Sequence, residues 1–198
     1  MEGFPDNDKD MTMLRLNVVI ASTRPGRVGA AVGTWFYEFA REHGNFDVRW
    51  VDLVDFNLPI FDEPHHPRLQ NNQHEHTRRW AASVDEADAY VFVVPEYNYG
   101  PTPALLNALN YVYKEWNYKP AAFVSYGGVS GGIRSVQASK LTLTTLKMVP
   151  LMEQVMVPMV AQHLVDGAFQ AEKVHQDSAV VMLDELHRWA SALEPLRG

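Results

Sequence analysis

The sequence contains one nearly continuous apolar run, Ala89-Tyr90-Val91-Phe92-Val93-Val94, followed at once by Pro95-Glu96-Tyr97-Asn98-Tyr99-Gly100-Pro101-Thr102-Pro103. A strand that is covered by helices on both faces needs apolar side chains at every position, whereas a half-exposed strand alternates. The run therefore predicts the central strand of a parallel sheet. The stretch after it would lie at the carboxyl end of that strand, where open α/β sheets bind their ligands.

Segments of strand and helix character alternate on both sides of this run. Further strands are predicted at residues 14–20, 47–53, 120–126 and 151–157. Helices are predicted at residues 28–42, 74–86, 103–112, 130–146 and 177–193. This alternation predicts an α/β fold, a doubly wound sandwich whose five-stranded parallel sheet carries helices on both faces. We expect a single domain over residues 13–198, preceded by a flexible N-terminal leader at residues 1–12.

The composition argues against several classes of function. The 198 residues carry a formal charge of −7, whereas a nucleic-acid partner requires clustered Lys and Arg. Since there is no cysteine, thiol chemistry and Cys-ligated metals are excluded, and redox chemistry would need a bound cofactor. No apolar run approaches the ~20 residues of a membrane span, and the first residues lack a signal-peptide core. We therefore expect a cytoplasmic protein that does not bind membranes.

A loop with anion-binding character follows the first predicted strand. It reads Ala21-Ser22-Thr23-Arg24-Pro25-Gly26-Arg27-Val28-Gly29 and ends where a helix begins. The helix N-terminus offers unpaired N–H groups and a partial positive charge. Two hydroxyl side chains and two arginines add further donors, which suits a monophosphate. The G-x-G-x-x-G pattern that serves the pyrophosphate of NAD is missing. A tight turn with a helix cap is the alternative that this loop alone leaves open.

Two more loops are expected at the same edge of the sheet. In the stretch 95–103, prolines fix the backbone and two tyrosines offer flat faces to a planar heterocycle. The loop Tyr126-Gly127-Gly128-Val129-Ser130-Gly131-Gly132 follows the fourth strand, and its glycines allow a backbone to approach a flat ring closely. Taken singly, each loop is also explained as a rigid connection or a glycine-rich turn. Together, the three loops predict a cofactor site.

These loops, with Leu106-Asn107-Ala108-Leu109-Asn110, resemble those of the NADPH-dependent FMN reductases, a flavodoxin-like family that includes quinone and azo-dye reductases. The resemblance runs from about residue 14 to residue 193. It implies that FMN is the cofactor and that NADPH or NADH donates hydride to the flavin N5. Electrons would then pass to a second acceptor such as a quinone, an azo compound, a metal ion or free flavin. Because the flavin carries this chemistry, no catalytic side chain is implied.

The resemblance also implies a set of binding residues. Ser22, Arg24 and Arg27 would hold the FMN phosphate, residues 95–99 would line the isoalloxazine, and Gly127 and Gly128 would contact it from the facing loop. All residues expected to bind the cofactor are Ser22, Thr23, Arg24, Arg27, Val28, Gly29, Pro95, Glu96, Tyr97, Asn98, Tyr99, Tyr126, Gly127 and Gly128. No metal ligand is expected.

Three positions depart from the family pattern: Ala21 stands for a usual glycine, and Leu106 and Asn110 stand where many members carry Lys and Asp. These positions are not expected to touch the phosphate, so they bear on partner contacts or acceptor preference. The alternative function is a flavodoxin-type FMN electron carrier that does not oxidise nicotinamides. Carriers tend to have a phosphate loop without arginine, so the two arginines of this loop favour the enzyme.

Three further expectations concern the rest of the chain. The family is often dimeric, which predicts a homodimer or a dimer of dimers, and the aromatic stretch 111–118 suits either an interface or packing within one subunit. Histidines at positions 65, 66, 74 and 76 lie in a Pro/Asn/Gln-rich loop that is expected to rim the active site without binding a metal. Four methionines are expected to fill gaps in the core around the last strand, namely Met148, Met152, Met156 and Met159.

Overall fold

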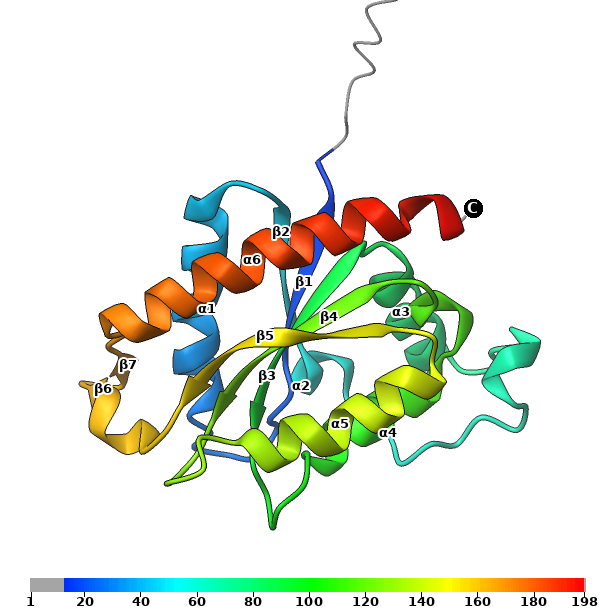
Figure 1. Ribbon diagram of the computed structural model, residues 1–198. Helices are drawn as coiled ribbons and strands as arrows, with labels where there is room; N and C mark the ends of the chain where they lie inside the picture. Colours follow the sequence, from blue (N-terminus) through cyan, green and yellow to red (C-terminus); the bar gives the residue numbers. More distant parts are fainter. Residues whose placement is uncertain (1–12, 198) are drawn as a thin grey trace, which may run out of the picture.

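The computed structural model describes residues 13–197, so the leader predicted for residues 1–12 lies outside the described part of the chain. Five parallel strands form one sheet in the order β2-β1-β3-β4-β5 (Figure 1). They are β1 Arg15–Ile20, β2 Asp47–Asp52, β3 Ala89–Pro95, β4 Pro120–Tyr126 and β5 Val149–Val157. The strand order changes direction between β1 and β3, and this switch point opens at the carboxyl ends of the strands. The predicted sheet is confirmed.

Helices cover both faces of the sheet (Figure 1). The helices α1 Gly29–His43 and α6 Lys173–Leu193 pack on one face, and α3 Glu75–Asp85, α4 Pro103–Tyr111 and α5 Ile133–Thr145 pack on the other with the short α2 Leu53–Phe56. The largest difference from the sequence prediction is at the start of α6, expected at Asp177. The helix begins earlier because Glu172 and His175 form a capping box, in which each side chain bonds the other residue's backbone.

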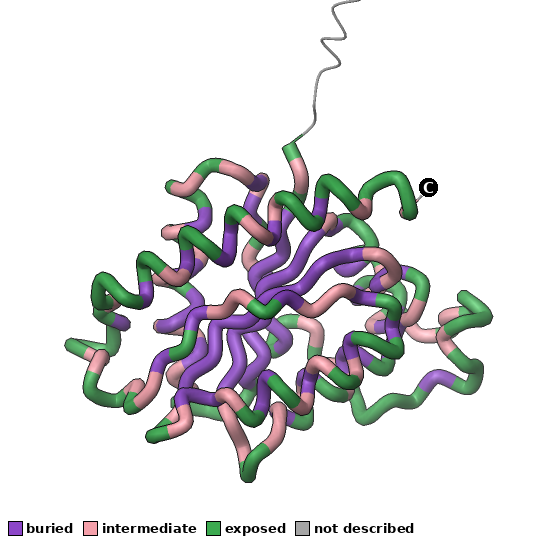
Figure 2. Tube along the Cα trace, viewed as in Figure 1, coloured by how far each residue is buried: buried purple, intermediate pink, exposed green. Residues whose placement is uncertain are grey.

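The central strand β3 connects the two halves of the core. All seven of its residues are buried, as the apolar run predicts (Figure 2). Val91 and Val93 pack toward α1 and α6, whereas Tyr90 and Phe92 pack toward α3, α4 and α5. Since neither face meets water, both sets of side chains must be apolar. This arrangement leaves only the ends of the strand to carry polar, functional loops.

The aromatic stretch 111–118 packs mainly within the subunit. Tyr111 and Trp116 are fully buried, while Tyr113 and Tyr118 are half-buried. The Trp116 ring lies edge-on against Tyr90, with the ring centroids 4.9 Å apart. Of the two roles that the sequence left open for these residues, the structure assigns the two buried rings to the core.

The prediction for the methionines is wrong for three of the four. Met148 is buried, but Met152 is 81% exposed, and Met156 and Met159 are 41% exposed. For Met152 and Met156 the reason is topological, because β5 is an edge strand and is only partly covered, whereas Met159 lies beyond the end of β5. Sequence periodicity does not reveal which strand lies at an edge.

Small elements were not predicted. A hairpin pairs β6 Leu164–Val165 with β7 Ala168–Phe169 through Asp166 and Gly167, whose φ angles are 50° and 80°. Asp-Gly is a preferred pair for such a turn, so a signal was present. Four 3₁₀ turns lie at Pro67–Leu69, Lys114–Trp116, Val160–His163 and Glu194–Leu196. Within residues 13–197, none of the helices has the length and apolar character needed to cross a membrane.

Candidate cofactor site

The three predicted loops meet at one edge of the sheet. β3 pairs with both β1 and β4, so the loops that follow these strands leave the sheet side by side. They enclose a cleft of about 160 Å³. The residues that line this cleft are Arg24, Arg27, Val28, Pro95, Glu96, Tyr97, Tyr126, Gly127 and Val160. Eight of these nine were in the predicted set, and Val160 was not.

The backbone N–H groups at the start of α1 lack hydrogen-bond acceptors. No side chain caps this helix, and its first turn contains no acidic residue. Within the described chain, the backbone N–H groups of residues 22–24, 26 and 28–30 donate to no protein acceptor. Such a run of free donors at a helix N-terminus, together with the helix dipole, favours an anion. The alternative of a turn closed by a helix cap is therefore not what the structure contains.

The two arginines of this loop differ in their surroundings. Arg24 is exposed, and its guanidinium carbon lies 5.9 Å from the centre of the Tyr97 ring, beside the cleft. Arg27 donates through Nη2 to Asp52 Oδ2 at 2.5 Å and through Nη1 to the Ser22 carbonyl at 2.8 Å. The side chains of Arg27 and Asp52 are only 18% and 8% exposed. Arg27 therefore fixes the loop against β2, whereas Arg24 remains available to a ligand.

The side chain of Ser22 points into the protein and not toward the exposed side of the loop. Its hydroxyl is buried and accepts a hydrogen bond from the Tyr126 hydroxyl, 3.1 Å away. Burial raises the pKa of Tyr126 to about 12, so this phenol stays protonated and can donate. Gly29 packs against the pair, and a Cβ at this position would lie 2.3 Å from Ser22 Oγ. A direct bond from Ser22 to a phosphate stays a prediction and would require the loop to open.

Glu96 joins the second loop to the third. Its carboxylate accepts hydrogen bonds from Ser130 Oγ at 3.0 Å, from the Arg134 backbone N–H at 3.2 Å and from Arg134 Nε at 2.6 Å. Burial alone would raise the pKa of Glu96, but the hydrogen bonds from Arg134 and Ser130 outweigh it and lower the pKa below its usual value. Glu96 thus stays ionised and caps the start of α5.

The other predicted residues divide into two groups. Tyr97 and Gly127 line the cleft, and their contact with the flavin ring stays a prediction. The residues that do not line it are Thr23, Asn98, Tyr99 and Gly128, and all four are exposed. The segment after β5 folds over the glycine loop, where Val160 N–H donates to the Gly127 carbonyl at 3.0 Å. Its position after the carboxyl end of a strand was the signal that could have identified Val160.

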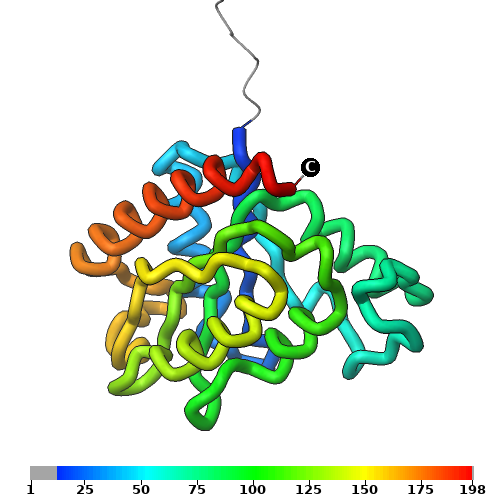
Figure 3. Tube along the Cα trace, turned by 45° about the vertical axis from the view of Figure 1, so that its right-hand side comes forward, coloured from blue at the N-terminus to red at the C-terminus, as the bar shows by residue number. Residues whose placement is uncertain are grey.

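The histidine-containing segment between α2 and α3 extends from the body of the molecule (Figures 1 and 3). His76 Nε2 lies 2.9 Å from Asp62 Oδ1, and the His74 ring stacks on His76 with centroids 5.1 Å apart. Asn107 of α4 holds the start of the segment by accepting from the Phe61 N–H at 2.9 Å. Among residues 13–197, no three acidic or histidine side chains converge as a metal site would require.

Comparison with known proteins finds similar sequences among FMN reductases. The family model described as NADPH-dependent FMN reductase matches residues 14–162. An NAD(P)H-dependent FMN reductase of Schizosaccharomyces pombe is 35% identical over 164 residues, which cover 80% of this chain and 82% of that protein. One from a Nectria species is 34% identical and covers 75% and 77%. The structure of the flavoenzyme NAD(P)H:(acceptor) oxidoreductase FerB of Paracoccus denitrificans superposes with a TM-score of 0.71 at 20% identity, covering 90% of this chain and 98% of FerB.

Proposed function

The chain belongs to the NADPH-dependent FMN reductase family, and from this premise we propose that it binds FMN in the cleft between its three loops. The family resemblance predicted from the sequence is thereby confirmed. We propose further that the protein oxidises NAD(P)H and reduces a second acceptor such as a quinone, an azo compound, a metal ion or free flavin. The bound flavin supplies the redox chemistry, so the protein residues bind and orient.

One observation carries the proposal, namely the run of unpaired N–H groups at the uncapped start of α1. A monophosphate bears nearly two negative charges, and this helix end offers the matching donors without any competing carboxylate. The exposed Arg24 adds a positive charge beside these donors. The flat ring of the cofactor would then lie in the cleft, between Pro95 and Tyr97 on one side and Gly127 on the other.

An anaerobic titration tests the proposed activity. The purified protein is loaded with FMN, and its visible spectrum is followed after NADPH is added without oxygen. Bleaching of the flavin band within a catalytic turnover time is the expected result. A bound flavin that stays oxidised would indicate an electron carrier of the flavodoxin type instead. A protein that remains colourless after reconstitution with FMN would contradict both functions.

The Arg24→Ala variant tests the phosphate site. Because a hydrogen bond to a charged group contributes about 1.5–3 kcal/mol, the affinity for FMN should fall at least about 10-fold. Riboflavin lacks the phosphate, so its affinity should not change. Both are measured by quenching of flavin fluorescence on the apoprotein. Arg41→Ala, an exposed arginine in the last turn of the same helix, is the control and should bind FMN normally. Equal losses for FMN and riboflavin would place Arg24 elsewhere in the site.

We also propose that the protein forms a homodimer through the segment between α2 and α3. Several apolar side chains of this segment face water: Ile60 is 91% exposed, Leu69 is 67% exposed and Phe61 is 37% exposed. The backbone that carries Ile60 and Phe61 is held in place, because Asn107 contacts both Pro59 and Phe61. A fixed apolar surface of this kind is typical of a protein interface.

The Ile60→Asp variant should weaken this dimer. A charge at the centre of an apolar interface is buried without a partner when the subunits associate, so the dissociation constant should rise at least about 10-fold. Sedimentation equilibrium measures the change. Val181→Asp is the matched control, since Val181 is 54% exposed on α6, which packs on the opposite face of the sheet. If Val181→Asp dissociates the dimer and Ile60→Asp does not, the interface has been placed on the wrong face.

A further inference from the structure

Tyr99 lies at the tip of the loop after β3 in a backbone conformation that tyrosine disfavours. Hydrogen bonds from Tyr97 N–H to the Gly100 carbonyl (2.9 Å) and from Gly100 N–H to the Tyr97 carbonyl (3.0 Å) close a two-residue turn. Its two central residues, Asn98 and Tyr99, have φ angles of 49° and 67°. Asn-Gly is the preferred pair in such a turn because glycine adopts positive φ without steric strain. This chain places an aromatic residue where glycine is favoured.

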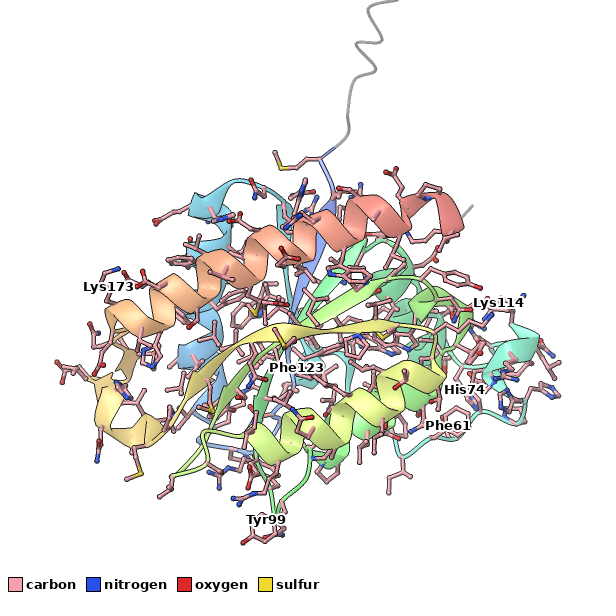
Figure 4. The ribbon with its side chains drawn as sticks, in the orientation of Figure 1. Phe61, His74, Tyr99, Lys114, Phe123 and Lys173 are labelled. Atoms are coloured by element: carbon pink, nitrogen blue, oxygen red, sulfur yellow. The ribbon has the colours of Figure 1, made fainter. Side chains whose placement is uncertain are left out.

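Packing does not explain the tyrosine. Its side chain is 69% exposed and points away from the body of the molecule at the tip of the loop (Figure 4). It does not line the cleft, although Tyr97, two residues earlier, does. A strained residue that contributes nothing to the core is often part of a functional site.

The ring is nevertheless held in a fixed orientation. The guanidinium carbon of Arg134 lies 3.9 Å from the centre of the Tyr99 ring. Arg134 is itself fixed, because Nε and Nη2 contact Glu96 Oε1 at 2.6 Å and 2.5 Å. Since Glu96 also lines the cleft, the chain of contacts from Glu96 through Arg134 to Tyr99 connects the cleft to its rim. The aromatic ring is thus supported by a cation on one side while most of its surface faces water.

We propose that Tyr99, supported by Arg134, is a stacking platform for the planar aromatic ring of a substrate at the rim of the flavin cleft. The inference rests on the proposed function, in which a nicotinamide donor and a second acceptor both reach the flavin. Two substrates carry a suitable ring: an aromatic acceptor of the quinone type, and the donor through its adenine. Offset stacking on a preoriented tyrosine favours either ring, and the ordered Arg134–Glu96 pair limits the entropy lost on binding.

Three variants separate the effect of the aromatic ring from the effect of the backbone strain. Tyr99→Gly and Tyr99→Ala both remove the ring, whereas Tyr99→Trp keeps a flat aromatic surface. With menadione as acceptor and NADPH as donor, both ring-deleted variants should raise one of the two KM values about 10-fold, with kcat within twofold. The KM that rises identifies which ring is stacked. Tyr99→Trp should keep the wild-type values. With ferricyanide, an octahedral acceptor that has no flat ring, the KM of the acceptor should not change.

Urea unfolding gives a readout that is independent of activity. The Tyr99→Gly variant should unfold at a higher urea concentration than Tyr99→Ala, because only glycine relieves the left-handed backbone. Unchanged KM values for both menadione and NADPH would overturn the platform, whereas equal urea midpoints would contradict the backbone strain from which it is argued. If the wild-type protein binds no FMN or is not reduced by NADPH, the proposed function fails, and the platform fails with it. If the wild-type protein is active but the KM values of the ring-deleted variants match those of wild type, the platform alone is wrong.

Discussion

The Arg27→Ala variant is expected to lose about 3 kcal/mol of unfolding free energy, because removing one partner of a buried ion pair leaves the other charge uncompensated. Asp52 is buried, and without Arg27 it would keep only the hydrogen bond from the Val54 N–H at 3.1 Å. The variant would also release the Ser22 carbonyl, which Arg27 Nη1 now contacts. Urea unfolding followed by circular dichroism measures the loss.

Two comparisons test the origin of this effect. Arg24→Ala removes an exposed arginine from the same loop and should change the unfolding free energy by no more than about 0.5 kcal/mol. The double variant Arg27→Ala/Asp52→Ala should be more stable than the sum of the two single losses predicts, because the pair is coupled. A loss of less than about 1 kcal/mol in Arg27→Ala would show that the ion pair does not fix the loop.

The Gly29→Ala variant should reduce FMN affinity more than about 100-fold, which corresponds to about 3 kcal/mol. The added Cβ would lie 2.3 Å from Ser22 Oγ and 2.5 Å from the Tyr126 hydroxyl. Both side chains are buried, so neither can rotate into solvent. The loop and the start of α1 must therefore shift, and the N–H groups that would surround the phosphate are displaced together. Overpacking should also lower the unfolding free energy by about 1–3 kcal/mol.

Gly33→Ala is the matched control for this prediction. Gly33 lies one turn further along α1, and its added Cβ would also be too close to a neighbour, 2.2 Å from Ile20 Cδ1. That atom is the flexible end of a side chain outside the cofactor site. We therefore expect some loss of stability and an FMN affinity within about twofold of wild type. Wild-type FMN affinity in Gly29→Ala, measured by fluorescence titration, would mean that the phosphate does not bind at the start of α1.

Much of the fold could be predicted because its signals are local. The fully apolar run at residues 89–94 indicates a doubly covered strand without any knowledge of its neighbours. The ranges of the other strands and helices follow from periodicity and turn residues in the same way. The exposed Met152 and Met156 could not be predicted, because exposure depended on β5 being an edge strand.

The meeting of the three loops could also be predicted, but the contacts of their residues could not. Loops after adjacent parallel strands must meet at one edge, and the loop 21–29, the stretch 95–103 and the glycine loop do meet there. Arg24 and Arg27 look alike in the sequence, yet one is exposed and the other is paired with Asp52, which is 25 residues away along the chain. The same holds for Tyr99, which was expected to line the flavin ring and instead lies outside the cleft on Arg134.

The sequence alone therefore determined the sheet, its covered faces and the edge that carries the loops, since these depend on residue type and spacing along one segment. Only the tertiary structure decided which side chains are exposed and which are hydrogen-bonded to other residues. Three hydrogen bonds each join segments that are separate in the sequence, namely Tyr126–Ser22, Arg27–Asp52 and Arg134–Glu96. Strand order and helix packing bring these groups within hydrogen-bond distance, and no local pattern encodes such a pairing.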